Sequence, residues 1–169
     1  MSGRLVILDG HGIIFRAYFA VREPLVIRDT GEVVTAVYGF ANTLLRTIAE
    51  LKPTHIALAM DTKGPTFRHK LDASYKANRP PMPEDLPSQI SRCRAVADAF
   101  SIPIFEASRY EADDVLATLA DQAVSMGVET WLATMDSDLI QLVRPGVSVF
   151  MYRPYQRDTV LYDSREKVR

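Results

Sequence analysis

Short apolar segments alternate with helical patterns along the chain, and this alternation constrains the fold more than any other feature of the sequence. Runs rich in β-branched and other apolar residues predict strands over 4–8, 55–60, 102–105, 129–134, 147–152 and 159–162, the last two as a hairpin. Apolar residues recur at helical spacing over 36–48, 90–100 and 112–126, and a short helix is expected over 13–20. Strands separated by helices predict an α/β fold, with a mainly parallel central sheet flanked by helices on both faces.

The composition is that of one globular domain without repeats or linkers. The chain has 169 residues, 47% of them apolar and 24% charged, enough to bury a core without disulfides or a structural metal. Cys93 is the only cysteine, so a disulfide framework and a Cys-rich zinc site are excluded and a reducing compartment is favoured. No apolar run approaches the roughly 18 residues of a membrane span. The formal charge of -1 excludes a uniformly basic nucleic-acid binder, but not a chain whose charges are separated in space.

Acidic side chains follow the predicted parallel strands or begin the helix after the third of them. Because the carboxyl ends of parallel strands meet at one edge of a sheet, we expect these acids to converge there. Such a cluster repels itself unless cations occupy it, and hard divalent cations prefer oxygen ligands. Two such ions can activate a water and stabilise the leaving oxygen of a phosphodiester. The predicted metal ligands are Asp9, Asp61, Glu111, Asp113, Asp114, Asp136 and Asp138.

Each of these acids also has a simpler role when it is considered alone. An aspartate after a strand commonly forms a turn or caps a helix. Acids in a first helical turn complement the helix dipole, and Ser108 with Glu111 matches a capping box. Independent caps need not follow every parallel strand at the same end, so the joint pattern favours a metal site.

A basic segment, residues 62–81, lies directly after the second predicted strand. It carries a single acid, Asp72, and its basic residues are Lys63, Arg68, Lys70, Lys76 and Arg79. Prolines at its end predict extended chain before the next helix. The segment would be a solvated loop without a partner if it stood alone. Its position beside the acids instead favours cations that neutralise phosphate charge and attract a polyanion, with Phe15 or Tyr75 able to stack on a base.

Six sequence blocks, in this order and over most of the chain, resemble the 5′-3′ exonuclease domains of bacterial DNA polymerases I, which belong to the flap endonuclease family. Any one block would be weak, but the six together are specific. The blocks are Val6 to His11, Ala36 to Phe40, Phe67 to His69, Tyr75 to Arg79, Tyr110 to Val115 and Thr134 to Leu139.

The resemblance implies a PIN-like, resolvase-like fold in which the basic segment forms a helical arch over the site. It implies an enzyme that removes 5′ flaps and RNA primers from branched duplexes in replication and repair, using two divalent ions (Mg²⁺ or Mn²⁺) and water. The acids named above match the metal-site acids of the family. Lys76 and Arg79 match its catalytic basic residues beside the scissile phosphate, and together with Phe15 and Arg68 they are the expected DNA-binding residues.

The chain departs from the family pattern in two respects. Ser137 stands where polymerase-linked members usually carry lysine. The last metal ligands of the family, its helix-hairpin duplex-binding module and the polymerase domain are expected beyond residue 169. We therefore expect residues 1–169 to be the N-terminal part of a PIN-like nuclease domain, weakly active alone. Its expected partners are 5′-flapped DNA and downstream domains of the same polypeptide. The implied location is the bacterial cytoplasm, associated with the nucleoid and not with a membrane.

Two other functions stay open at this point. A PIN-type ribonuclease would carry similar acids, although the long basic segment and the block from Tyr110 to Val115 favour the flap endonucleases. A catalytically silent nucleic-acid-binding module is the second alternative. A pure binder, however, gains nothing from negative charge concentrated near DNA.

Overall fold

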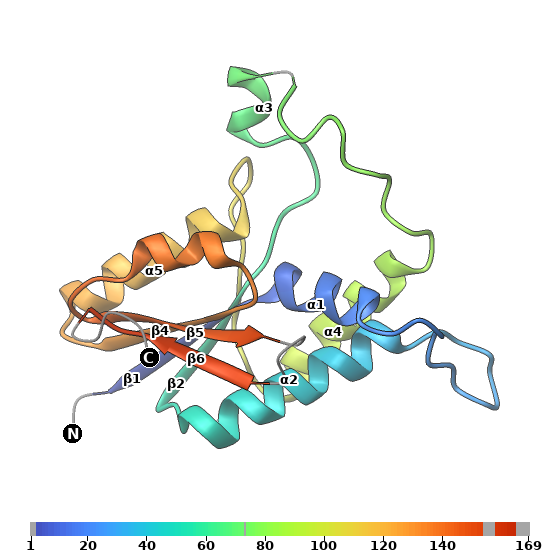
Figure 1. Ribbon diagram of the computed structural model, residues 1–169, viewed down its shortest axis with the longest axis horizontal. Helices are drawn as coiled ribbons and strands as arrows, with labels where there is room; N and C mark the ends of the chain where they lie inside the picture. Colours follow the sequence, from blue (N-terminus) through green and yellow to red (C-terminus); the bar gives the residue numbers. More distant parts are fainter. Residues whose placement is uncertain (1–2, 73, 154–157, 165–169) are drawn as a thin grey trace.

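The computed structural model describes residues 3–72, 74–153 and 158–164, and Figure 1 shows their arrangement. The strands are β1 (Arg4–Asp9), β2 (His55–Ala59), β3 (Ile104–Phe105), β4 (Glu129–Thr134), β5 (Val147–Arg153) and β6 (Asp158–Tyr162). The helices are α1 (Gly10–Phe19), α2 (Thr35–Leu51), α3 (Phe67–Leu71), α4 (Leu86–Ala99), α5 (Ala112–Ser125) and the 3-10 helix η1 (Ser137–Leu142). None of the described helices is both long and apolar enough to cross a membrane.

The strands form one sheet, in the order β3-β2-β1-β4-β5-β6. All neighbouring strands are parallel except β5 and β6, which pair as an antiparallel hairpin, so the predicted mainly parallel sheet is confirmed. Leu8 of β1 lies opposite Leu58 of β2 and Ala133 of β4, and these three strands therefore end at the same edge. The chain moves outward from β1 to β3 and then returns to the other side of β1. Open α/β sheets place their binding sites at such a reversal.

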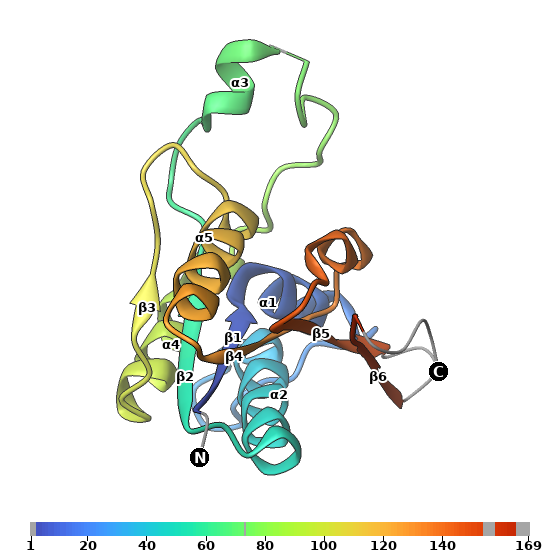
Figure 2. The same cartoon turned by 90° about the vertical axis from the view of Figure 1, so that its left-hand side faces the viewer.

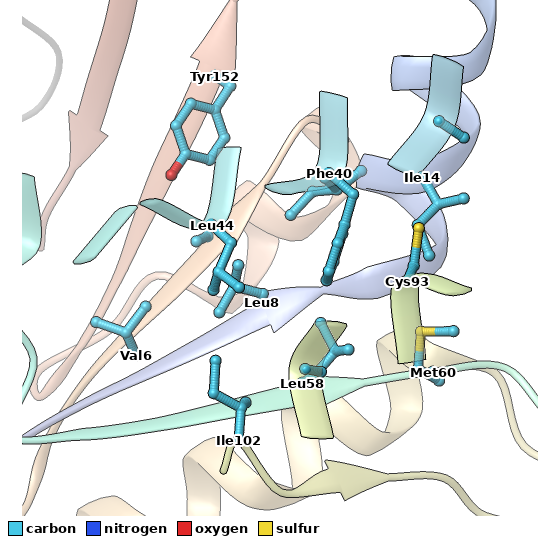
Figure 3. Close-up of a cluster of buried hydrophobic side chains, with 14 of the residues drawn as sticks. Val6, Leu8, Ile14, Phe40, Leu44, Leu58, Met60, Cys93, Ile102 and Tyr152 are labelled. Carbon is cyan, nitrogen blue, oxygen red and sulfur yellow. The ribbon is translucent and has the colours of Figure 1, made fainter. Parts of the chain in front are cut away.

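Side chains of the central strands alternate between two hydrophobic clusters, one on each face of the sheet. Val6 and Leu8 of β1 pack with α1, α2 and α4, whereas Ile7 packs under α5, and Figure 1 shows α5 on the opposite side of the sheet from α2 and α4. Phe40 of α2 is fully buried in the first cluster, close to Leu8 in Figure 3. Cys93 lies in the same cluster as predicted, and burial raises the pKa of its thiol to about 12.

The segment between β2 and α4 leaves the sheet and projects away from it, as Figures 1 and 2 show. We call its residues 62–81 the arch segment. Among its described residues the one helix is α3, which has no buried side chain, and residues 74–81 run through turns to Pro80 and Pro81 without regular structure. This irregular course agrees with the proline pattern, since proline has no backbone N–H to donate. The loop before α5 supports the start of α3, where the N–H of Phe67 donates to the carbonyl of Arg109 at 2.9 Å.

Two helices begin earlier than the sequence predicts. The helix expected over 13–20 begins directly after β1, because the carboxylate of Asp9 caps it. The helix expected over 90–100 begins at Leu86, so Pro87 belongs to its first turn and not to the extended segment. Proline is tolerated in a first turn because the N–H groups there have no partner within the helix.

The ends of α5 test two further predictions. The capping box proposed for Ser108 is wrong, because Glu111 is the N-cap residue and its backbone N–H donates to Asp114 Oδ2 at 3.0 Å. The C-terminal prediction is confirmed, since Gly127 follows the helix with φ 75°, a conformation in which a Cβ is unfavourable. The helix therefore lies as predicted, but a different pair of acids fixes its start.

Candidate active site

Carboxylates gather where β1, β2 and β4 end. Asp9 is the last residue of β1, Asp61 follows β2, and Asp136 follows β4. Two more acids come from the start of α5, and all of them line one open cleft of about 1390 Å³. The predicted metal ligands that line the cleft are Asp9, Asp61, Glu111, Asp113 and Asp136, and Glu106 lines it as well. Asp9 also caps α1, and Asp136 also caps η1. The same side chains therefore serve as helix caps and line the cleft.

The other two predicted metal ligands lie outside the lining of this cleft. Asp114 accepts two hydrogen bonds from the guanidinium of Arg68, at 2.7 and 2.9 Å, and these bonds hold the pKa of Asp114 below its usual range. Asp138 is exposed, and its backbone N–H donates to Asp136 Oδ1 at 2.9 Å. Their role as metal ligands stays a prediction.

Asp9 is the most enclosed acid of the cleft, with 4% of its surface exposed. Its Oδ1 accepts from the N–H of Gly12 at 2.9 Å, and its Oδ2 accepts from the hydroxyl of Thr134 at 2.9 Å. A Cβ at position 12 would collide with this carboxylate, so the close approach requires glycine. Burial raises the pKa of Asp9, and the charges of Asp61 and Asp136 raise it further. The two hydrogen bonds lower the pKa but do not cancel this rise.

Asp113 is also affected by burial and by the charges of the other cleft acids. Burial raises its pKa to about 6, and the nearby charges of Asp9, Asp136, Asp61 and Glu111 add to the shift. Oxygen donors with uncompensated negative charge are the chemistry that a hard divalent cation requires, so the donor set fits such an ion. Within the described part of the chain, however, no three Asp, Glu, His or Cys side chains form a ready-made ligand cluster.

His11 and the start of α5 fix the position of Asp61. The backbone N–H of Asp61 donates to Nδ1 of His11 at 3.0 Å, and Asp61 Oδ1 accepts from the N–H of Ala112 at 2.6 Å. Burial lowers the pKa of His11, which keeps the ring neutral so that Nδ1 can accept. From the sequence alone, His11 is predicted to be a loop residue. Its place two positions after Asp9, within the block from Val6 to His11, is a signal that could have indicated this role.

The arch segment is bonded to the first turn of α5 through its basic residues. Lys76 Nζ lies 2.6 Å from Glu111 Oε1, and the hydroxyl of Tyr75 donates to Glu111 Oε2 at 3.0 Å. Arg68 adds its bidentate contact with Asp114. Burial alone would raise the pKa of Glu111, but the bonds from Lys76 and Tyr75 and the charge of Arg68 keep it low. Two of the seven predicted acids are thus compensated by the arch segment.

The wall of the cleft combines predicted and unpredicted residues. Phe15, Lys76 and Arg79 line it, whereas Arg68 does not. Arg16 and Arg94 also line it, and the sequence analysis did not select them. Arg16 Nη2 donates to the carbonyl of Met135 at 3.3 Å, and Arg94 Nη1 lies 2.7 Å from Glu106 Oε2. Only the packing of α1 and α4 against the sheet brings these two cations to the acidic edge.

The raised pKa of Asp113 predicts how the stability of the metal-free protein depends on pH. An acid whose pKa is higher in the folded state destabilises that state once it ionises, so stability falls as the pH rises from about 4 through about 6. Asp113→Asn removes this charge, so the variant should be more stable than the wild type at pH 7. We expect its advantage in free energy of unfolding to be about 1 kcal/mol larger at pH 7 than at pH 4. The expected difference is modest because solvent screens a partly exposed group. Urea denaturation in a chelator across this range measures the difference. A difference that is independent of pH would contradict the raised pKa of Asp113.

The fold and the cleft define a class: a resolvase-like α/β domain with an acidic cleft at the carboxyl ends of its parallel strands and basic residues on the cleft wall. The family described as "5'-3' exonuclease, N-terminal resolvase-like domain" matches residues 4–168, and the chain belongs to this family.

Curated relatives match this chain over a small part of their own length. The chain is 46% identical over 161 residues to DNA polymerase I of Chloroflexus aurantiacus, which covers 94% of the chain and 17% of that protein. It is 42% identical over 148 residues to the thermostable DNA polymerase I of Thermus thermophilus, which covers 88% of the chain and 18% of that protein. The chain thus spans less than a fifth of the length of these relatives.

Solved structures share the fold at low sequence identity. The T5 D15 protein co-crystallised with metal ions superposes with a TM-score of 0.70 at 19% identity, covering 95% of this chain and 57% of that protein. Flap endonuclease-1 from Methanococcus jannaschii gives a TM-score of 0.63 at 19% identity, covering 98% of this chain and 58% of that protein. The expected PIN-like architecture, mainly parallel with helices on both faces, is therefore confirmed.

Proposed function

We propose that this chain is the metal-binding nuclease part of a 5′-3′ exonuclease that hydrolyses phosphodiester bonds in 5′-flapped DNA. The observation that carries the proposal is the cleft itself, which is lined both by carboxylates and by the basic residues Lys76 and Arg79. The acids can hold cations, and the basic side chains can bind the phosphates of a polyanion. Membership of the exonuclease family and the polymerase relatives support the same reaction.

The candidate metal ligands are the cleft acids, above all Asp9, Asp61, Asp113 and Asp136. A divalent cation bound there supplies a polarised water and stabilises charge on phosphate oxygens. A related structure of T5 5′-exonuclease contains divalent zinc ions, which supports a divalent cofactor, and we propose Mg²⁺ or Mn²⁺ for this chain. Glu111 also lines the cleft, and the bonds from Lys76 and Tyr75 compete with a metal ion for its oxygens.

The other residues of the cleft bind and orient the substrate. Lys76 and Arg79 contact phosphate oxygens beside the bond that breaks, and Arg68 supports the arch segment from outside the cleft. The ring of Phe15, which lines the cleft, offers a stacking surface for a base. Neutral His11 accepts from the backbone of Asp61 and so holds that carboxylate toward the other acids.

A titration with Mg²⁺ and Mn²⁺, followed by both thermal melting and cleavage, tests the function. Cations bound only by the folded chain stabilise it by about 2.7 kcal/mol at 100 times the dissociation constant. For a chain of this size we expect the melting temperature to rise by about 5–10 °C. Cleavage of labelled 5′-flap DNA should require the metal and should exceed cleavage of blunt duplex or single-stranded RNA.

The matched variants are Asp136→Asn, which removes a carboxylate from the cleft, and Asp98→Asn, which removes an exposed one near the end of α4. Asp136→Asn should lose both the thermal shift and the cleavage, whereas Asp98→Asn should retain them. Preferential cleavage of single-stranded RNA would favour a PIN-type ribonuclease. A silent binding module would be favoured if flap DNA is bound but not cleaved. This result would have to hold both for this chain and for a longer polypeptide that contains it.

A further inference from the structure

Thr134 connects two of the cleft acids through one hydroxyl group. It is the last residue of β4 and is fully buried. Its Oγ1 lies 2.9 Å from Asp9 Oδ2 and 2.9 Å from the backbone nitrogen of Asp136. An N–H can only donate, so the bond from Asp136 uses a lone pair of the hydroxyl. The hydroxyl proton is then directed to Asp9, and a single side chain spans the ends of β1 and β4.

The contact with Asp9 completes the fixation of that carboxylate. Asp9 Oδ1 is held by the N–H of Gly12, and Oδ2 is held by Thr134. Glycine at position 12 permits this close approach, because a Cβ there would collide with the carboxylate. Without the hydroxyl, one oxygen of a buried carboxylate would lose its donor, and the group would be free to rotate.

The contact with Asp136 fixes where the chain leaves β4. The N–H of Asp136 lies beyond the last ladder pair, Thr134 with Met151, and the hydroxyl of Thr134 supplies the acceptor that the sheet no longer offers. Asp136 Oδ1 in turn accepts from the N–H of Asp138 at the start of η1. The hydroxyl therefore determines the position of Asp136 through its backbone and of Asp9 through its side chain.

We propose that Thr134 is a positioning residue that holds Asp9 and Asp136 in register, against their mutual repulsion, so that both can bind one divalent cation. This inference rests on the proposed function, because it concerns the same cleft. It assigns no chemistry to Thr134, which contacts carboxylate and backbone groups only. Groups that orient metal ligands commonly account for 10- to 100-fold in metal affinity.

The test compares Thr134→Val, which keeps the shape and removes the hydroxyl, with Thr134→Ser, which keeps the hydroxyl. Thr130→Val is the matched control, since Thr130 is also fully buried on β4, but its hydroxyl donates to the carbonyl of Val128, at the other end of the strand. Isothermal titration with Mn²⁺ gives the affinity, and metal-free melting gives the stability. We expect Thr134→Val to weaken Mn²⁺ binding by about 10- to 100-fold, Thr134→Ser to restore most of it, and Thr130→Val to leave it unchanged.

The inference is wrong if Thr134→Val binds Mn²⁺ as the wild type does, if serine fails to rescue, or if Thr130→Val weakens binding equally. Should Thr134→Val not fold, Thr134→Ala supplies the same loss of the hydroxyl, and its affinity decides by the same criteria. Wild-type protein that binds no Mn²⁺ would overturn both this inference and the proposed function. Wild-type protein that binds Mn²⁺ in a manner dependent on Thr134, yet leaves flap DNA intact in the longer polypeptide as well, would overturn the proposed function alone.

Discussion

Lys76→Ala, in a polypeptide extended through the expected duplex-binding module, should lower the rate of flap cleavage by about 10²- to 10³-fold, far more than it lowers the affinity for flap DNA. The ammonium group of Lys76 lies at the cleft, 2.6 Å from Glu111, and can stabilise negative charge that develops on the phosphate during hydrolysis. Such an interaction is stronger in the transition state than in the ground state, so its loss reduces the rate of the bound complex. Single-turnover kinetics at saturating enzyme measure this rate, and a binding titration in Ca²⁺ measures the affinity.

Lys70→Ala is the matched control for this prediction. Lys70 belongs to the same arch segment, on α3, but it is exposed and lies outside the cleft lining. Its loss should weaken binding slightly, through one fewer long-range attraction, and leave the single-turnover rate unchanged. If Lys76→Ala binds weakly but cleaves bound substrate at the normal rate, Lys76 is a docking residue and not a catalytic one.

Phe40→Ala is expected to lower the free energy of unfolding by about 3–5 kcal/mol. Phe40 is fully buried between α2 and the sheet, in the cluster that also contains Leu8 and Leu58 (Figure 3). Removal of the ring loses its transfer free energy and leaves a cavity that rigid strands cannot fill. Urea denaturation followed by circular dichroism measures the loss.

Tyr38→Ala controls for the effect of shortening an aromatic residue on the same helix. Tyr38 is 60% exposed, so its replacement should change the free energy of unfolding by no more than about 0.5 kcal/mol. Equal losses in the two variants would show that the face of α2 has been assigned wrongly. A loss confined to Phe40→Ala would support the two-cluster arrangement of the core.

The strands, the longer helices and the acidic edge follow from local patterns in the sequence. Buried parallel strands are continuous apolar runs, as in Arg4–Asp9, and long amphipathic helices repeat their apolar residues, as in Thr35–Leu51. An acid directly after such a strand must lie at the carboxyl edge of the sheet. The positions of Asp9, Asp61 and Asp136 could therefore be predicted once the strands were known.

The contacts of the arch segment could not be predicted, because they depend on how distant parts of the chain approach one another. Nothing in the spacing pairs Arg68 with Asp114, 46 positions away, and nothing aims Lys76 at Glu111. The positions of Arg16 and Arg94 could not be predicted for the same reason, because these residues reach the cleft only when α1 and α4 pack on the sheet. The 3-10 helix η1 was missed as well, since its six residues are too few to show a helical period.

The projection of α3 away from the sheet has a consequence for the order in which parts of the molecule open. A helix without a fully buried side chain gains little from the hydrophobic effect. Helix α3 is retained by the hydrogen bond of Phe67 to Arg109, the ring contact of Phe67 with Tyr110 and the ion pair of Arg68 with Asp114. The free energy needed to open it is a small fraction of that needed to open β1, whose side chains fill both hydrophobic clusters. Backbone amides of α3 should therefore exchange with deuterium through local openings, while those of β1 exchange only when the whole domain unfolds.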